Sequence, residues 1–189
     1  MNLTDEELYD RFLAEHSEDD FRVLFDRHKE GLMLFLNGWV RNLDDAEELM
    51  IDAFAEAAAG RTFFARKCSF KTWLFSIGKK LALMHLRKAG RAETVSVEQD
   101  DIELADEKSG PPELAILSDE RNRQVYRALS KIHIDYRRVL MLLYFDDLSH
   151  EEVAKVMGKS RKQVYHLAER GRKALREIME KEGFEYENI

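Results

Sequence analysis

The sequence predicts an all-α fold of two small helical domains, joined by a flexible acidic linker, with a helix-turn-helix in the C-terminal domain. Three observations predict this fold. Apolar residues recur at helical spacing through most of the 189 residues. Side chains that cap helices stand where these periodic segments begin. Proline occurs only twice, at Pro111 and Pro112, inside the one long segment where the periodicity fades.

The N-terminal domain begins with two predicted helices. The first covers residues 3–14 and is capped by Thr4, with Glu7 three residues later as its capping-box partner. The second is longer and opens at Ser17 or Asp19. Its apolar side holds Phe21, Leu24, Phe25, His28, Leu32, Phe35, Leu36 and Trp39.

Two further helices complete this domain. Asp44 is the expected N-cap of a helix that Gly60 ends. A loop follows at 61–69, and Ser69 or Thr72 then starts the next helix. Its apolar side holds Trp73, Leu74, Ile77, Leu81 and Met84 or Leu86, and its basic end holds Arg87 and Lys88.

The linker is predicted at 91–117, which sets the domains at 1–90 and 118–189. Residues 93–107 contain seven acidic side chains and no basic one, so a packed helix is not expected here. The stretch TVSV at 94–97 has strand propensity, but a lone strand has no partner to pair with.

The C-terminal domain ends in the predicted helix-turn-helix. Ser149 with Glu152, and Ser160 with Gln163, have the spacing of two capping boxes. Gly158 lies between them and permits a sharp turn. Two earlier helices are expected, one seeded by Leu114, Leu117, Val125, Leu129 and Ile132, and one over Tyr136 to Phe145.

Composition narrows the function classes. The net charge is −7, and 44% of the residues are hydrophobic, which fits a folded protein. Cys68 is the only cysteine, so no internal disulfide can form, as in cytoplasmic proteins. The acidic N-terminal segment does not resemble a secretory signal, and no apolar run approaches membrane-spanning length. We therefore expect a cytoplasmic protein without a membrane segment.

The charge is unevenly distributed, and its basic parts predict a nucleic-acid partner. Residues 61–91 carry nine basic side chains and no acidic one. The last helix is also basic, and in a helix-turn-helix its N-terminal end enters the DNA major groove. Side chains there that can contact bases or phosphates are Ser160, Arg161, Lys162, Gln163, Tyr165, His166, Arg170 and Lys173.

The basic segment at 61–91 also contains aromatic residues, a combination typical of single-stranded nucleic-acid binding. Phe70 and Trp73 are expected in the core. Phe63 and Phe64, in the loop, are the better candidates for stacking on bases.

Three motifs together resemble the extracytoplasmic-function (ECF) sigma factors of bacterial RNA polymerase. DAEELMIDAF at 45–54 is similar to the family's Asp-Ala-Glu-Asp-Leu-x-Gln-Glu-x-Phe. SFKTWLFSI at 69–77 resembles Phe-x-Thr-Trp-Leu-x-x-Ile, with Arg87-Lys88 at the basic end of that helix. RGRKAL at 170–175 resembles Arg-Ala-Arg-x-x-Leu and ends the helix-turn-helix. The motifs cover nearly the whole chain in the family's order.

The resemblance implies a role for each segment and no catalysis, cofactor or metal. Core polymerase, through its β′ clamp and β flap, would be one partner, promoter DNA another and an anti-sigma factor a third. The polymerase-binding residues would be Asp45, Glu47, Glu48, Leu49, Asp52 and Phe54. The promoter −10 element would be opened and held by Phe63, Phe64, Arg66, Lys67, Lys71, Lys79, Lys80, Arg87 and Lys88. The basic helix at 161–173 would bind the −35 element, and the linker would thread toward the active-site cleft.

The chain departs from the family pattern at four places. Ile51 replaces a glutamine, Lys80 an asparagine, Met84 an aspartate, and Leu129-Ser130 a Leu-Pro pair. These departures predict a divergent subgroup with its own −10 preference.

Three other classes of protein fit the sequence less well. An enzyme is disfavoured because the six histidines show no metal-ligand spacing and no glycine-rich phosphate loop occurs. A stand-alone helix-turn-helix regulator predicts a dimer, but leaves the basic aromatic segment unexplained. An RNA-binding adaptor would prefer structured RNA without polymerase.

The alternating charge also predicts that the free protein binds DNA poorly, because acidic parts of the chain or an anti-sigma factor mask its basic surfaces.

Overall fold

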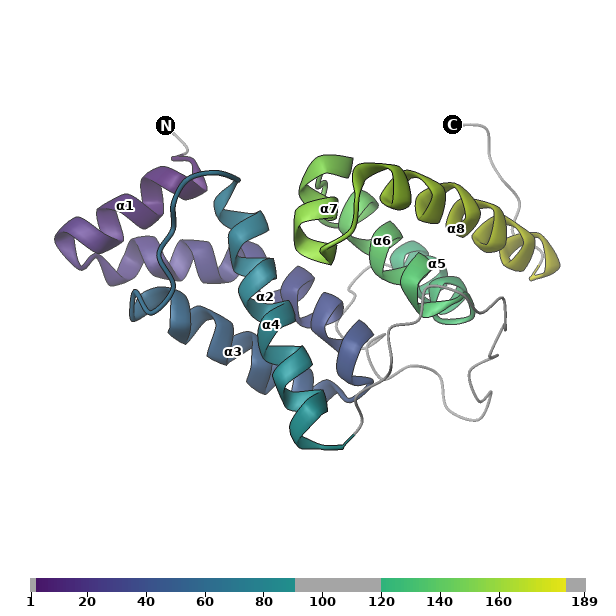
Figure 1. Cartoon of the computed structure of the whole chain (residues 1–189), viewed down its shortest axis with the longest axis horizontal. Helices are drawn as coiled ribbons and strands as arrows, with labels where there is room; N and C mark the ends of the chain where they lie inside the picture. Colours follow the sequence, from purple (N-terminus) through teal and green to yellow (C-terminus); the bar gives the residue numbers. More distant parts are fainter. Residues whose placement is uncertain (1–2, 91–119, 183–189) are drawn as a thin grey trace.

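The computed structural model describes residues 3–90 and 120–182, which form eight α-helices and no strand (Figure 1). This confirms the predicted all-α fold. The predicted linker at 91–117 and the TVSV stretch lie outside the described residues. The helices are α1 (Asp5–Glu15), α2 (Glu18–Val40), α3 (Leu43–Ala58), α4 (Phe70–Lys88), α5 (Glu120–Ser130), α6 (Ile134–Tyr144), α7 (His150–Met157) and α8 (Arg161–Lys181).

Local capping chemistry sets most helix starts where the sequence predicted them. The side chains of Thr4, Ser149 and Ser160 form complete capping boxes at the starts of α1, α7 and α8. Ser17 caps α2, and Ser69 caps α4.

Two predicted starts were wrong. The cap of α3 is Asn42 rather than Asp44, because the Asn42 side chain accepts the backbone N–H of Asp45 at 3.0 Å. Helix α6 begins at Ile134, before the predicted Tyr136, because the His133 side chain caps it.

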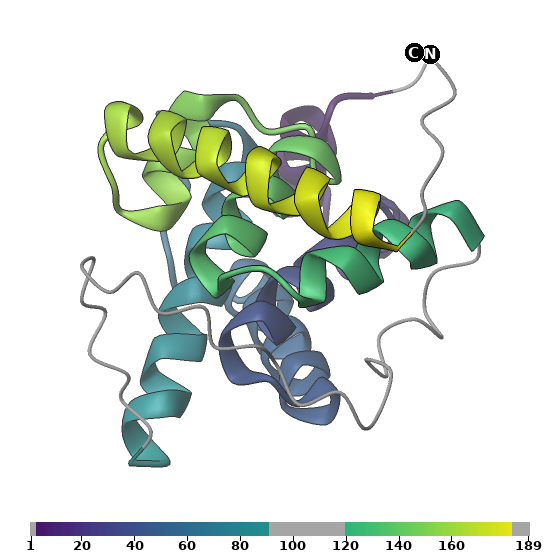
Figure 2. The same cartoon turned by 90° about the vertical axis from the view of Figure 1, so that its right-hand side faces the viewer.

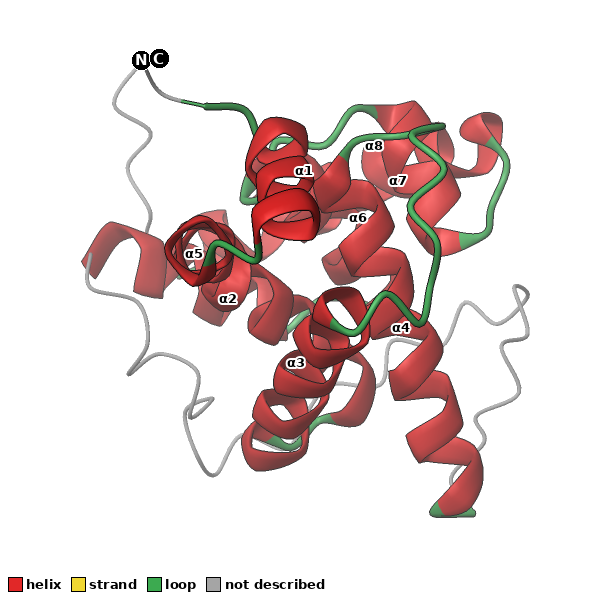
Figure 3. Cartoon of the chain, turned by 90° about the vertical axis from the view of Figure 1, so that its left-hand side faces the viewer, coloured by secondary structure: helices red, strands yellow, loops and turns green. Residues whose placement is uncertain are grey.

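Helices α1–α4 form the N-terminal half around an aromatic cluster. The Tyr9 ring lies 5.0 Å from Phe70 and 5.4 Å from Trp73, measured between centroids. The Tyr9 hydroxyl donates to the carbonyl of Ala57 at 2.9 Å, which ties α1 to the end of α3. The C-terminal end of α4 projects away from the rest of the molecule (Figures 2 and 3).

Helices α5–α8 form the C-terminal half, in which α8 lies across α5, α6 and α7 (Figure 2). The turn between α7 and α8 depends on Gly158, whose φ of +66° lies in the left-handed region. Val153 and Val156 on α7 pack with Val164 and Ala168 on α8, and all four are buried. The predicted helix-turn-helix is therefore present.

The two halves pack against each other and share one hydrophobic core. Leu32 of α2 and Phe75 of α4 belong to the same buried cluster as Val139 of α6 and Val153 of α7. The contacting pairs are α2 with α6 and α4 with α7. The predicted division into domains 1–90 and 118–189 stays a prediction, and the described residues of these segments are in close contact.

Candidate nucleic-acid interface

The N-terminal turn of α8 presents a row of exposed polar and basic side chains. Arg161, Lys162, Gln163, Tyr165 and His166 are all exposed, whereas their neighbour Val164 is buried against α7. The hydrophobic side of α8 is therefore held by the fold, and its other side is free for a ligand. Farther along the helix, Arg170 and Lys173 are also exposed.

Gln163 has a role in the fold as well as a predicted role in recognition. Its Oε1 accepts the backbone N–H of Ser160 at 2.8 Å, and the Ser160 hydroxyl accepts the backbone N–H of Gln163 at 3.2 Å. A bidentate contact with adenine uses both ends of a glutamine amide, so Oε1 would have to accept a second hydrogen bond beside the one from Ser160. The amide N–H groups remain available to donate.

Tyr165 is the largest apolar group on this surface, with 53% of its area exposed. Its ring centroid lies 6.2 Å from that of His150, the first residue of α7. The two helices of the motif thus both contribute to the same surface.

The two adjacent phenylalanines of the loop between α3 and α4 differ sharply in exposure. Phe63 is 86% exposed, whereas Phe64 is 9% exposed and packs 5.0 Å from Trp73 and 5.9 Å from Tyr9 between ring centroids. The prediction that Phe64 offers a stacking face is corrected, because its ring is enclosed by the aromatic cluster. Phe64 instead anchors the loop that carries Phe63.

A small hollow of about 90 Å³ lies beside Phe63. Its wall combines loop residues with one side of α1, and it is lined by Tyr9, Asp10, Leu13, Gly60, Thr62, Phe63, Phe64 and Arg66. Arg66 forms an ion pair with Asp10, which ties the loop to α1. Sequence reasoning missed these α1 residues, because the 48% exposure of Leu13 is visible only in the structure.

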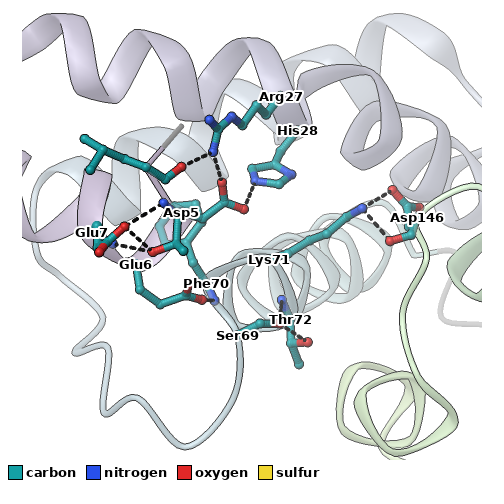
Figure 4. A network of polar contacts seen from close by, with 12 residues as sticks. Asp5, Glu6, Glu7, Arg27, His28, Ser69, Phe70, Lys71, Thr72 and Asp146 are labelled. Atoms are coloured by element: carbon teal, nitrogen blue, oxygen red, sulfur yellow. Dashed lines mark hydrogen bonds and ion pairs between the residues drawn. The ribbon is translucent and has the colours of Figure 1, made fainter. Parts of the chain in front are cut away.

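A polar network fixes the start of α4 and thereby the loop before it (Figure 4). A carboxylate oxygen of Glu6 accepts the backbone N–H of Phe70 at 2.7 Å. Asp5, the neighbour of Glu6 on α1, lies 2.6 Å from His28 Nε2 and 2.7 Å from Arg27. Burial alone would raise the pKa of Asp5, but the hydrogen bonds and charges of His28 and Arg27 outweigh it and lower that pKa.

The basic residues of the predicted −10 set fall into two groups. Five are exposed: Arg66, Lys67, Lys80, Arg87 and Lys88. Lys71 and Lys79 instead reach the C-terminal half. The Lys71 ammonium donates to the carbonyl of Asp146, and the Lys79 ammonium donates to the carbonyl of Met157, both at 2.5 Å.

The predicted polymerase-binding residues of α3 also divide. Glu47, Glu48 and Asp52 are exposed and share their surface with Ile51, which is 51% exposed. Asp45 lies 3.4 Å from His85 of α4. The apolar members of the predicted set, Leu49 and Phe54, are buried in the core, so they support the helix from inside.

Three of the departures from the family pattern lie on the surface. Ile51, Lys80 and Met84 are all exposed, the last at 42%. They therefore change what the molecule presents to partners and leave its core unchanged.

A helix-turn-helix with a basic recognition helix, combined with a second basic surface that carries an exposed aromatic ring, defines a DNA-binding protein of the sigma class. The comparisons agree. The chain matches the family Sigma-70 region 2 over residues 24–92 and the family Sigma-70, region 4 over residues 122–175. This chain belongs to the sigma factors of RNA polymerase, and its 30% identity to an ECF sigma factor over most of both chains places it in the ECF group.

Individual relatives resemble it over most of their length. It is 30% identical over 169 residues to the ECF RNA polymerase sigma factor SigX of Bacillus subtilis (strain 168), covering 86% of this chain and 85% of that protein. It is 28% identical over 178 residues to the ECF RNA polymerase sigma-E factor of Escherichia coli (strain K12), covering 88% of this chain and 92% of that protein.

The fold is also similar to a solved structure. This is the sigma factor RpoE of Bartonella quintana in complex with the anti-sigma factor NepR, with a TM-score of 0.59 at 24% identity. The match covers 85% of this chain and 97% of that one. Among the described residues, no helix is both long and apolar enough to cross a membrane.

Proposed function

We propose that this ECF sigma factor directs bacterial core RNA polymerase to promoters by binding two DNA elements in different forms. The N-terminal turn of α8 reads the −35 element as a duplex, with Arg161 and Lys162 toward the bases and Arg170 and Lys173 toward phosphates. The loop with Phe63 and the basic end of α4 hold the −10 element as a single strand.

The exposure of Phe63 is the observation that carries this proposal. A phenylalanine with 86% of its area in water has no role in the core. Buried Phe64 and the Arg66–Asp10 ion pair hold it there, beside a hollow and a basic helix. An unstacked base gains roughly 1–3 kcal/mol from stacking on such a ring, and a regulator that binds only duplex DNA has no use for it.

The exposed acidic face of α3 supports docking on a basic surface of the polymerase. Glu47, Glu48 and Asp52 supply the charge, and Ile51 supplies an apolar contact at the centre of the patch. Interfaces of this kind gain affinity from an apolar centre and orientation from charge. We assign the docking site to these four residues.

The remaining assignments follow from this role. The chain acts by binding, without catalysis, in the cytoplasm where bacterial DNA and polymerase meet. An anti-sigma factor is a further expected partner, as for the relative from Bartonella quintana.

Run-off transcription over a randomised promoter library, with purified bacterial core polymerase, tests the proposal. Transcripts that need this protein and share −10 and −35 motifs are expected. If the protein neither produces such transcripts nor co-purifies with core polymerase, a stand-alone DNA-binding regulator replaces this proposal.

A further inference from the structure

Four elements of the fold contribute charged or polar side chains to a cluster around Trp39 of α2. Lys79 comes from α4, Asp135 and Arg138 come from α6, and Lys159 comes from the turn between α7 and α8. The guanidinium of Arg138 lies 3.7 Å from the centroid of the Trp39 ring, and the Lys79 ammonium lies 5.5 Å from it. These five residues are called the Trp39 cluster below.

The carboxylate of Asp135 is shared between two cations of the cluster. Its Oδ1 lies 3.3 Å from Nη1 of Arg138, and its Oδ2 lies 3.7 Å from Nζ of Lys159. A full charge-assisted hydrogen bond is shorter, at about 2.7–2.9 Å. Asp135 is therefore stretched between the two cations and offsets the charge of Lys159 only at long range.

Lys79 has a neutral hydrogen-bond acceptor instead of an acid. Its ammonium donates to the carbonyl of Met157 at 2.5 Å, and no carboxylate of the described residues forms an ion pair with it. Burial lowers the pKa of Lys79, and the positive charges of Lys159 and Arg138 lower it further, against the smaller effect of Asp135. An anion beside Lys79 would relieve this repulsion.

A second observation indicates that the cluster can take up an acceptor. Trp39 is 6% exposed, and its indole Nε1 is buried with no hydrogen-bond partner in the part of the chain that the structure describes. Buried donors are normally paired, so an unpaired one indicates a place that a ligand or water completes. Lys79, Asp135 and Lys159 are partly exposed, so a solute can reach the cluster.

We propose that the Trp39 cluster is a binding site for a phosphate-bearing anion, which goes beyond the proposed function. Its donors come from four elements, and a planar carboxylate with two oxygens does not match such a set. A phosphate group offers three or more acceptor oxygens in a tetrahedral arrangement and carries about −1.5 to −2 charges at pH 7. These properties suit two ammonium groups, a guanidinium and an indole N–H.

Two sources can supply this chemistry, namely a free phosphate-bearing anion and the backbone of DNA. Lys79 belongs to the predicted −10 set, so a DNA source would rest on the proposed function. Trp39, Arg138 and Lys159 lie outside both predicted DNA-binding sets. The experiment therefore compares inorganic phosphate directly with DNA.

The test uses the full chain with two variants that each remove one cation from the cluster. Lys79→Gln and Lys159→Gln each keep an amide donor, so they change charge more than hydrogen bonding. Lys155→Gln is the matched control. Lys155 is an exposed lysine four residues before Lys159, and it lies outside the cluster and the predicted DNA-binding sets.

The first measurement is thermal unfolding in sodium phosphate and in sodium chloride, at equal pH and ionic strength. A ligand at about ten times its Kd should raise the Tm of a chain of this size by about 3–6 °C. Phosphate also stabilises folded proteins in general, but this effect acts on all four proteins alike. We therefore expect wild type and Lys155→Gln to gain more from phosphate than the two cluster variants do.

The second measurement is isothermal titration with inorganic phosphate and with a short single-stranded DNA of mixed sequence. Loss of one charged hydrogen-bond donor should weaken phosphate binding roughly tenfold or more. We expect this loss in Lys79→Gln and Lys159→Gln and unchanged affinity in Lys155→Gln. If DNA alone bound with this dependence on both lysines, the phosphate chemistry would stand and its source would be the DNA backbone.

Equal responses of all four proteins to phosphate and to DNA would overturn the site. Binding by wild type that both cluster variants retain in full would also overturn it, because the anion would then bind elsewhere. A variant that has lost helical content before heating is replaced in the comparison by the other one. The run-off assay decides the sigma function separately, so a failure of this site leaves that result unchanged.

Discussion

The two adjacent phenylalanines of the α3–α4 loop provide a sharp test, because one belongs to the fold and the other to the proposed DNA site. Phe64→Ala empties a position enclosed by Tyr9, Phe70 and Trp73. Such a truncation costs about 3–5 kcal/mol. For a chain of this size each kcal/mol lowers the Tm by about 2–4 °C, so a fall of about 6–20 °C is expected.

Phe63→Ala should have the opposite profile. The ring is 86% exposed, so its loss should change stability by no more than about 0.5 kcal/mol. Losing one stacked base costs about 1–3 kcal/mol, which corresponds to a roughly 5- to 150-fold loss in promoter opening by the holoenzyme. Phe63→Tyr keeps the ring and should retain most of the opening.

The assays are thermal unfolding by circular dichroism and permanganate footprinting of melted promoter DNA with core polymerase. A Phe63→Ala variant that melts promoters as well as wild type would refute the stacking role. A Phe63→Ala variant with a Tm as low as that of Phe64→Ala would refute the division between fold and function.

Four further predictions follow from named contacts. Arg161→Ala should relax −35 specificity, at about 1–3 kcal/mol per lost base contact, without loss of holoenzyme assembly in a pull-down. Glu48→Lys should have the reverse effect, namely loss of holoenzyme assembly. Assembly retained in this variant would contradict the α3 docking site. Ser160→Ala should cost about 0.5–2 kcal/mol in denaturant unfolding, because α8 loses its N-cap; an unchanged midpoint would contradict this. Asp5 has a pKa below its ordinary value of 3.8 because of His28 and Arg27, so its stabilisation is present above that pH and is lost as the pH falls through the lower folded-state value. Asp5→Asn should therefore lower the Tm near neutral pH, and this difference should shrink in acid.

The helix-turn-helix could be predicted from the sequence because its signals are local. Both capping boxes span four residues, and the Gly158 turn lies directly between them. The cap of α3 was missed for a related reason. Asn42 and Asp44 are both good N-caps and lie within one turn, and the sequence alone does not decide which side chain accepts the bond.

The division between Phe63 and Phe64 could not be predicted in this way. Both residues are phenylalanines, lie in the same loop and have the same basic neighbours in the sequence. The tertiary packing of Tyr9, Phe70 and Trp73 decides which ring is enclosed, and Tyr9 lies more than fifty residues earlier. The role of the segment in DNA binding stays a prediction, whereas the exposed ring predicted for Phe64 was wrong.

Contacts between the halves were also beyond local patterns, although one signal was present. Glu152 and Thr72 are 80 residues apart, and Lys71 and Asp146 are 75 apart. Neither pair follows a helical period or a motif. Leu34, however, is a large apolar residue off the main apolar side of α2, and such a residue indicates a second packing partner.

The capping box of α7 couples the helix-turn-helix to the docking of the two halves. Glu152 uses Oε2 to accept the backbone N–H of Ser149, and Oε1 to accept the hydroxyls of Ser69 and Thr72. Burial raises the pKa of this carboxyl, but the hydrogen bonds outweigh burial and leave the pKa lowered. The first oxygen can keep its bond when the halves separate, while the second exchanges its two hydroxyl donors for water. A single carboxylate therefore caps α7 and also joins it to the start of α4.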